Sequence, residues 1–332
     1  MLRLVFMGSD AIALPALNWL TGEGREAAQI VGVFTQPDRA AGRGQKVQAN
    51  AVKLWALERD LPVLQPDKVG TAGCEQLAAL KPDLTLVMAY GHILRQEVLD
   101  TPRLGTFNLH TSVLPAYRGA SPIQAALTNG ETETGVTLMR LVLQLDAGPV
   151  AGVERVRIAP LDTARELEDK LAAACVPLLA RCLPRIVAGA QAFMPQVEAE
   201  ATYCRRLEKS DGVLDFNAPA ATLAARINGL MPWPGCAVVI NDQTVKLGQA
   251  DVCHILYDKP AAAGVVIGTD ADGLLVGTGQ GTLRLRLLQR PGGRMLPAGE
   301  FLRGFPIAAG TVLPSVPMPP LVARQPFIRP KG

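Results

Sequence analysis

The stretch Gly105-Thr106-Phe107-Asn108-Leu109-His110-Thr111-Ser112-Val113-Leu114-Pro115 predicts a mostly apolar strand that ends in polar side chains. Pro115 then predicts a turn, because proline cannot continue a hydrogen-bonded strand. Side chains of a strand alternate between its two faces, so Asn108 and His110 are expected to share one face. An amide and an imidazole placed side by side can stabilise a negative charge that develops on a carbonyl oxygen.

A carboxylate further along the chain can complete this site. The segment Leu145-Asp146-Ala147-Gly148-Pro149 places Asp146 on a predicted Gly-Pro turn. Such a carboxylate can orient or charge an imidazole. A lone histidine near a strand end is usually structural, but the company of Asn108 and Asp146 favours a catalytic role for His110. We therefore predict one catalytic site made of Asn108, His110 and Asp146, and no catalytic role for His92 or His254.

Composition favours a globular protein of roughly two domains, since the chain has 332 residues and 48% of them are hydrophobic. The six cysteines form no Cys-x-x-Cys pair, and with three histidines no zinc spacing is present. Scattered thiols fit a reducing cytosol, so we expect a cytoplasmic protein without a metal. No signal peptide and no apolar run near the length of a membrane helix is found.

The first part of the chain alternates predicted strands with predicted helices, which favours an α/β fold with a mostly parallel, Rossmann-like sheet. Ligands of such sheets bind beyond the carboxyl ends of the strands. A dinucleotide site is disfavoured, because Gly8 is the single glycine where the fingerprint needs three. The predicted strands span 2–7, 30–35, 61–64, 83–89, 106–110, 135–141 and 153–158. The predicted helices span 11–20, 52–59, 74–80, 96–99, 121–128 and 163–188, with Pro177 and Pro184 expected to break the last.

The character of the sequence changes near residue 190. A helix at 220–230 is followed by short predicted strands at 237–240, 244–247, 264–268, 274–277 and 283–288, which favour a small OB-like barrel. We predict a catalytic domain at 1–190, a linker at 191–207, an OB-like domain at 208–314 and an extended tail at 315–332.

Two basic segments are candidate contacts for a polyanion. From residue 201 onward the chain has 14 Lys/Arg and 9 Asp/Glu, against 19 and 21 in residues 1–200. A glycine-rich loop at 36–46 carries Arg39, Arg43 and Lys46, and the later segment has Arg205, Arg206 and Lys209. The loop at 36–46 either contacts phosphates of a large substrate or is a basic connection without a role. The later segment either contacts the polyanion or is a solvated face.

Several motifs together resemble a known family. Phe107-Asn108-Leu109-His110, Ser112-Val113-Leu114-Pro115 and Leu145-Asp146-Ala147-Gly148 resemble the signature of enzymes that transfer formyl from 10-formyltetrahydrofolate. The methionyl-tRNA formyltransferase family is indicated by four further motifs: FTQPDRAAGRG at 34–44, AYG at 89–91, YRGASPIQ at 117–124 and MPWPG at 231–235. The resemblance extends from Leu4 to about Leu313.

This resemblance implies an activity and a set of roles. The amine of methionine on initiator tRNA attacks the formyl carbon of the folate cosubstrate, Asn108 and His110 donate hydrogen bonds to the oxyanion, and Asp146 holds His110 or relays the amine proton. It also implies tRNA contacts from the two basic segments, a folate pocket and no metal. The chain is expected to act as a monomer without a membrane. The implied folate contacts are Ile93, Leu94, Ser112, Val113, Leu114 and Pro115.

Alternatives stay open at this point. One is a formyltransferase acting on a small amine, such as a sugar nucleotide or glycinamide ribonucleotide, and the other is a non-catalytic RNA-binding protein. Thr111 and Pro149 depart from the family pattern, where Gly and Asp are usual. Both lie beside the three predicted catalytic side chains and are not part of them.

Overall fold

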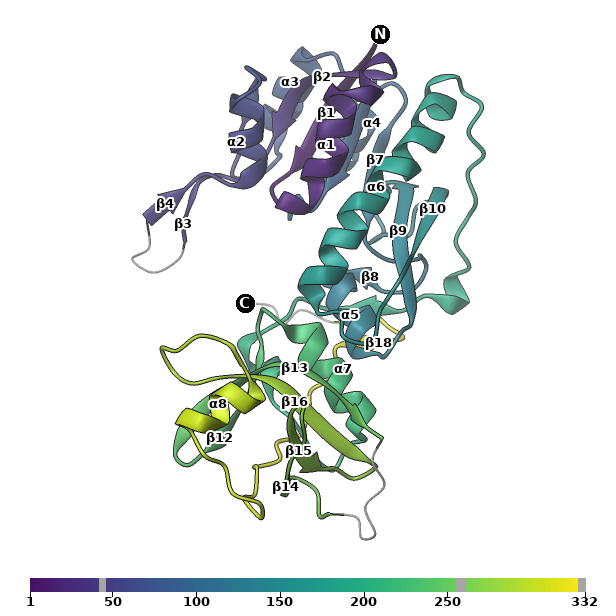
Figure 1. Ribbon diagram of the computed structural model, residues 1–332. Helices are drawn as coiled ribbons and strands as arrows, with labels where there is room; N and C mark the ends of the chain where they lie inside the picture. Colours follow the sequence, from purple (N-terminus) through teal and green to yellow (C-terminus); the bar gives the residue numbers. More distant parts are fainter. Residues whose placement is uncertain (42–45, 255–260, 328–332) are drawn as a thin grey trace. The chain divides into compact units, whose positions relative to one another are not determined.

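The computed structural model describes residues 1–41, 46–254 and 261–327 (Figure 1). The chain forms two compact units that interleave along the sequence. The first unit comprises 1–118, 135–156 and 168–201, and the second comprises 119–134, 157–167 and 202–332. The predicted borders of catalytic domain, linker and tRNA-binding domain concern function and stay a prediction.

A seven-stranded sheet in the order β10-β9-β7-β6-β1-β2-β5 is the centre of the first unit. Strand β1 pairs in parallel with β2 and β6, β2 with β5 and β6 with β7, whereas β9 is antiparallel to β7. The mostly parallel, Rossmann-like sheet expected from the sequence is confirmed. Its strands are β1 (Leu2–Gly8), β2 (Ala28–Phe34), β5 (Val63–Leu64), β6 (Leu84–Met88), β7 (Thr106–His110), β9 (Glu133–Arg140) and β10 (Val150–Arg157).

Helices cover this sheet, as Figure 1 shows for α1 and α6. The predicted helix at 11–20 begins as a 3-10 turn, Ala11–Ala13, because Pro15 occupies the first turn of α1 (Leu14–Thr21). The Asp10 carboxylate accepts from Ile12 N–H at 3.1 Å and so caps this turn. The other helices of this part are η2 (Glu23–Glu26), α2 (Ala51–Leu57), α3 (Thr71–Ala79), α4 (Gln96–Asp100) and α6 (Ala164–Val187).

The predicted break in the helix at 163–188 is wrong. Helix α6 continues over 24 residues with Pro177 and Pro184 inside it. A proline within a helix costs about 3 kcal/mol, because it removes one hydrogen bond and crowds the preceding turn. Leu171, Leu178 and Leu179 are each 0% exposed, and burying a leucine contributes about 1.5–3 kcal/mol. Packing of the apolar face therefore offsets the local penalty.

The basic loop expected at 36–46 is partly regular. Strands β3 (Arg39–Ala41) and β4 (Lys46–Gln48) pair as a separate antiparallel two-stranded sheet. Gln36 anchors its base, since the amide donates to the Tyr90 carbonyl at 2.9 Å. The first basic side chain, Arg39, is exposed on this ribbon.

The second unit contains an antiparallel sheet in the order β12-β13-β16-β15-β14, with β17 paired to β16. The second, β-rich domain expected from the short strands is confirmed and is antiparallel, whereas its OB type stays a prediction. The strands are β12 (Cys236–Ile240), β13 (Gln243–Cys253), β14 (Val266–Thr269), β15 (Leu274–Gly277), β16 (Thr282–Gln289) and β17 (Leu296–Pro297). The helical segments are α5 (Pro122–Thr128), η3 (Glu198–Glu200, still in the first unit), η4 (Lys209–Gly212), α7 (Ala220–Leu230) and α8 (Ala298–Gly304).

Short strands complete the described chain. Strand β8 (Arg118–Gly119) lies at the border between the units, and β11 (Tyr203–Cys204) pairs with β18 (Val322–Ala323) in the tail. The tail is therefore extended and partly hydrogen-bonded up to Phe327. Within the described ranges no helix is long and apolar enough to span a membrane.

The buried carboxylate of Asp211 contacts several residues at the start of the second unit. Asp211 has a side chain only 1% exposed, and it pairs with the Arg205 guanidinium at 2.5 Å. It also accepts from Glu208 N–H at 2.7 Å, and its carbonyl accepts from Arg226 at 2.8 Å. Burial alone would raise the pKa of Asp211, but the Arg205 guanidinium and the Glu208 N–H together hold that pKa below its ordinary value.

We expect Asp211→Asn to lower the free energy of unfolding at pH 7 by about 3–5 kcal/mol, because Arg205 would be left without its counter-charge. The depressed pKa means that this stabilisation is complete above the unfolded value of about 3.9 and is lost as pH falls through the lower folded value. Urea unfolding of both proteins between pH 3 and pH 7 measures the difference. An equal difference at every pH would contradict an ionic origin.

The cysteines behave as buried apolar residues, as the sequence predicts. Five of the six are buried, and Cys74 is half-buried. Burial raises the pKa of both Cys175 and Cys236 to about 12. Thiolates are the reactive form, so iodoacetamide at pH 8 should leave both unmodified in the folded protein and modify them in urea. Peptide mass spectrometry checks this, and rapid labelling of native Cys175 would contradict it.

Candidate active site

Strand β7 places two predicted catalytic side chains on one face. Asn108 pairs with Met139 of β9 and His110 pairs with Thr137, two positions apart in the same register. The Asn108 side chain is partly exposed and has no hydrogen-bond partner among the described residues. An amide without an internal partner keeps both N–H groups available for a ligand.

The His110 imidazole lies between two acceptors. Its Nε2 is 2.9 Å from the Tyr117 carbonyl oxygen, so Nε2 donates there. Its Nδ1 is 3.8 Å from Asp146 Oδ2, and the His110 and Asp146 side chains are 6% and 11% exposed. The predicted neighbourhood of His110 and Asp146 is therefore present, with an ion-pair distance between them.

Asp146 reaches His110 by an unexpected route. Because β9 runs antiparallel to β7, the segment 141–149 starts at the end of β9 remote from His110. It returns close against β9, where Arg140 N–H donates to the Pro149 carbonyl at 3.0 Å. A Cβ on Gly148 would lie 1.8 Å from the Arg140 carbonyl oxygen, so only glycine permits this approach. The backbone of Asp146 has a φ of 47°.

A buried threonine holds the segment after His110. Thr137 Oγ1 donates to the Ser112 carbonyl at 2.7 Å and accepts from Leu114 N–H at 3.1 Å. The Ser112 hydroxyl, fully buried, donates to the Ala116 carbonyl at 2.6 Å. The Leu114–Pro115 peptide bond is cis. This segment is therefore fixed by local hydrogen bonds before any ligand arrives.

The predicted folate contacts differ in exposure. Ile93 is 82% exposed and Leu94 is 8% exposed, so Leu94 belongs to the core while Ile93 faces solvent. Next to them the Tyr90 hydroxyl and His92 Nε2 are buried without hydrogen-bond partners in the described ranges. Burial raises the pKa of Tyr90 and lowers that of His92, so both groups are neutral at pH 7.

Leu114 and Pro115 line a pocket of about 380 Å³ together with Gln196 and residues of β10. A larger pocket of about 440 Å³ lies at the opposite end of β7, where Arg140 stacks over Phe107 and Phe193. Neither pocket is lined by Asn108, His110 or Asp146.

Three residues beside the site were given no role from the sequence. The Tyr117 carbonyl contacts His110, and the neighbouring Arg118 is 0% exposed. Gln196 connects Arg118 to the carbonyls of Asp146 and Gly148. The motif at 117–124 was the available signal for Tyr117 and Arg118, whereas Gln196 lies in the predicted linker.

The basic residues predicted to contact RNA are not equivalent. Arg39 is exposed, Lys46 begins β4, and Arg43 lies outside the described residues. Arg206 and Lys209 are exposed. Arg205, by contrast, is paired with Asp211 and contacts two backbone carbonyls, so its charge is already compensated.

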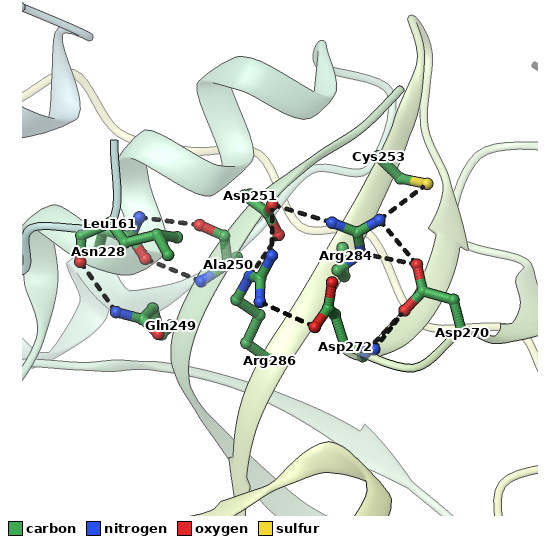
Figure 2. Close-up of polar contacts among 11 residues, drawn as sticks. Leu161, Asn228, Gln249, Ala250, Asp251, Cys253, Asp270, Asp272, Arg284 and Arg286 are labelled. Atoms are coloured by element: carbon green, nitrogen blue, oxygen red, sulfur yellow. Dashed lines mark hydrogen bonds and ion pairs between the residues drawn. The ribbon is translucent and has the colours of Figure 1, made fainter. Parts of the chain in front are cut away.

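A charged cluster on β13 and β16 is also self-compensated (Figure 2). Arg284 pairs with Asp251 at 3.1 Å and with Asp270 at 2.7 Å. Arg286 pairs with Asp251 at 2.9 Å and with Asp272 at 3.7 Å. Three carboxylates thus face two guanidinium groups, and this face has no surplus positive charge. Across the described ranges no group of three or more His, Cys, Asp or Glu could hold a metal ion.

Solved structures share this fold at low sequence identity. A sugar 3N-formyltransferase, WlaRD, described in the presence of dTDP and 5-N-formyl-THF, gives a TM-score of 0.65 at 18% identity, covering 86% of this chain and 97% of that one. The N-formyltransferase from Helicobacter canadensis, described with folinic acid and dTDP-3-aminofucose, gives 0.64 at 16% identity, covering 88% and 100%. At this level of identity the likeness shows the fold.

Sequence relatives are much closer. Residues 2–183 match the family model described as Formyl transferase, and residues 206–306 match Formyl transferase, C-terminal domain. A methionyl-tRNA formyltransferase of Burkholderia thailandensis is 43% identical over 93% of this chain and 96% of its own length. One of Acidovorax ebreus is 39% identical over 95% of this chain and 100% of its own. Because both domains and nearly the full length are matched, this chain is an enzyme of the formyl transferase family and belongs with the methionyl-tRNA formyltransferases.

Proposed function

We propose that this enzyme transfers the formyl group of 10-formyltetrahydrofolate to the α-amino group of methionine on initiator tRNA, in the cytoplasm at the start of translation. The observation that carries the proposal is the Asp146–His110 pair beside the unpartnered Asn108 amide on β7. This arrangement suits acyl transfer. The choice of substrates follows from the methionyl-tRNA formyltransferases that match nearly the whole chain.

The chemistry needs stabilisation of one oxyanion. The methionine amine attacks the formyl carbon, and the carbonyl oxygen becomes negative in the tetrahedral intermediate. Asn108 donates an amide N–H to this oxygen, and protonated His110 donates from Nδ1, since Nε2 is occupied by the Tyr117 carbonyl. The carboxylate of Asp146 stabilises the positive charge of the ring.

The proton balance is completed by Asp146. After attack, the amine nitrogen carries a surplus proton, which the carboxylate accepts directly or through water. The carbon–nitrogen bond to the folate then breaks as the oxyanion returns to a carbonyl, and the folate nitrogen takes the proton that Asp146 accepted, which restores the carboxylate. The products are formylmethionyl-tRNA and tetrahydrofolate.

The folate is proposed to lie along Ile93 and the segment Ser112–Pro115. Ile93 offers an exposed apolar surface, and Thr137 fixes the backbone of the second segment. The buried Leu94 would support this surface from beneath, whereas Val113 and Leu114 are less exposed than Ile93. No metal is invoked, because two hydrogen-bond donors polarise the carbonyl.

The tRNA is proposed to contact Arg39, Arg43 and Lys46 of the first basic segment and Arg206 and Lys209 of the second. Arg39, Arg206 and Lys209 are exposed and suited to phosphate contacts. Arg205 is better explained as the partner of Asp211. A single chain suffices for this scheme, so we propose a monomer.

We expect Asn108→Ala to lower kcat/KM for formylation by about 100- to 1000-fold, the usual cost of losing one oxyanion donor. The melting temperature should stay unchanged, because the amide has no internal partner to lose. Gln76→Ala is a matched control, since it removes an exposed amide on α3 of the same unit. The assay uses 10-formyltetrahydrofolate and charged initiator tRNA. Wild-type rates in Asn108→Ala would remove Asn108 from the mechanism, and no formylation by the parent would refute the function.

We expect Arg39→Ala to weaken tRNA binding while leaving folate binding unchanged. The slope of log K against log salt should become shallower by about one unit or less, since one phosphate contact is lost. Arg103→Ala is the control, because this exposed arginine is paired with Asp83 at 3.0 Å. Filter binding over a salt series measures both variants. An identical slope for Arg39→Ala and the parent would contradict a phosphate contact.

A further inference from the structure

Gln196 uses its whole hydrogen-bonding capacity to connect a buried arginine with the Asp146 segment. Its Oε1 accepts from Arg118 Nε at 3.1 Å and from Nη2 at 2.9 Å. Its Nε2 donates to the carbonyls of Asp146 and Gly148, both at 2.8 Å. An amide offers two acceptor lone pairs and two N–H donors, so Arg118 and the two carbonyls account for all four, and Met139 Sδ lies a further 3.9 Å from Nε2.

The orientation of this amide is dictated by its neighbours. Arg118 has only donors and is 0% exposed, so it must find acceptors inside the protein. Its Nη1 donates to both carboxylate oxygens of Glu198, at 3.0 and 2.9 Å. A flipped Gln196 amide would set N–H against N–H at Arg118 and oxygen against the two carbonyls. The guanidinium therefore fixes which end of Gln196 faces Asp146.

The segment Tyr117-Arg118 also contacts His110. The Tyr117 carbonyl accepts from His110 Nε2, and Tyr117 immediately precedes Arg118. The imidazole is thus contacted on one side by the backbone of Tyr117. On the other side lies Asp146, whose backbone is held through Gln196 by the Arg118 side chain. The two groups that contact the His110 ring, the Tyr117 carbonyl and Asp146, are therefore both held by the adjacent residues Tyr117 and Arg118.

We propose that Gln196, oriented by Arg118, is a positioning residue for formyl transfer, which holds the backbone at Asp146 so that the carboxylate stays at His110 Nδ1. This rests on the function proposed above. Asp146 has a left-handed φ of 47°, a conformation that costs a non-glycine residue about 1 kcal/mol or more. Two hydrogen bonds to the carbonyls of Asp146 and Gly148 offset this cost.

Gln196→Glu tests the proposal with the smallest change in shape. The new carboxylate keeps its acceptor for Arg118 but has no donor for the two carbonyls, which it repels. We expect kcat to fall by about 100-fold, as misplacement of a catalytic group by about 1 Å can cause. KM for tRNA and the Kd of a folate analogue should change less than kcat, because Gln196 touches neither reacting group.

A matched control and a second substitution keep the test decisive. The Gln191 amide likewise donates to two carbonyls, those of Ala151 and Ala192, at 2.7 Å each, but does not contact the Asp146 segment. Gln191→Glu should therefore keep a kcat near that of the parent. Gln196→Met removes all four hydrogen bonds at similar volume, and is used if Gln196→Glu melts below the assay temperature.

A double-mutant cycle separates positioning from general destabilisation. In an Asp146→Asn background the carboxylate is already gone, so adding Gln196→Glu should lower kcat only slightly further. An equal fall in both backgrounds, or a kcat for Gln196→Glu close to that of the parent, would overturn the positioning role. Failure of the parent to formylate methionyl-tRNA would instead refute the proposed function, so the two failures are distinguishable.

Discussion

The candidate active site depends on a single imidazole held between two acceptors that come from different parts of the chain. The Tyr117 carbonyl fixes Nε2, and this leaves only Nδ1 for chemistry. Asp146 must then arrive from the side of Nδ1, although the preceding strand β9 ends opposite Phe107 and not opposite His110. The close packing of Gly148 on Arg140 and the contacts of Gln196 follow from this requirement. Strand β7 of the sheet positions His110, and the segment 141–149 carries its charge partner, Asp146.

Much of this arrangement could be predicted from local patterns, and the remainder depends on tertiary contacts. The period of two placed Asn108 and His110 on one face, and the chemistry of the three side chains implied that Asp146 would join them. The antiparallel direction of β9 has no local signal, because strand propensity does not encode the direction of pairing. Gln196 lies in the predicted linker, and its local sequence carries no periodicity that points to Asp146. Pro177 and Pro184 looked like helix breakers, since the burial that tolerates them is visible only in the packed fold.

Net charge was an equally limited guide to the proposed tRNA contacts. The excess of basic residues from position 201 onward suggested a cationic face, yet Arg205, Arg284 and Arg286 are compensated internally. Arg205 is neutralised by Asp211, and Arg284 and Arg286 by the carboxylates of Figure 2. A charge that is paired at hydrogen-bond distance and partly buried releases few counterions on binding a phosphate. The exposed residues without such a pair, Arg206 and Lys209 among them, therefore matter more than the total.

Backbone strain points to the same place as the side-chain chemistry. Non-glycine residues with positive φ include Asp60, Lys81, Asn241 and Asp242, which lie in turns where polar residues adopt this conformation at modest cost. Ala89, Tyr117 and Asp146 also have positive φ, at 49°, 60° and 47°. Ala89 follows β6, Tyr117 offers its carbonyl to His110, and Asp146 offers its carboxylate to the same ring. An aromatic residue at positive φ is disfavoured unless its surroundings impose it, and here the buried Arg118 and the His110 hydrogen bond do so. Two of the strained residues are thus the two acceptors of one imidazole, which indicates that the fold accepts local cost in order to fix the orientation of that ring.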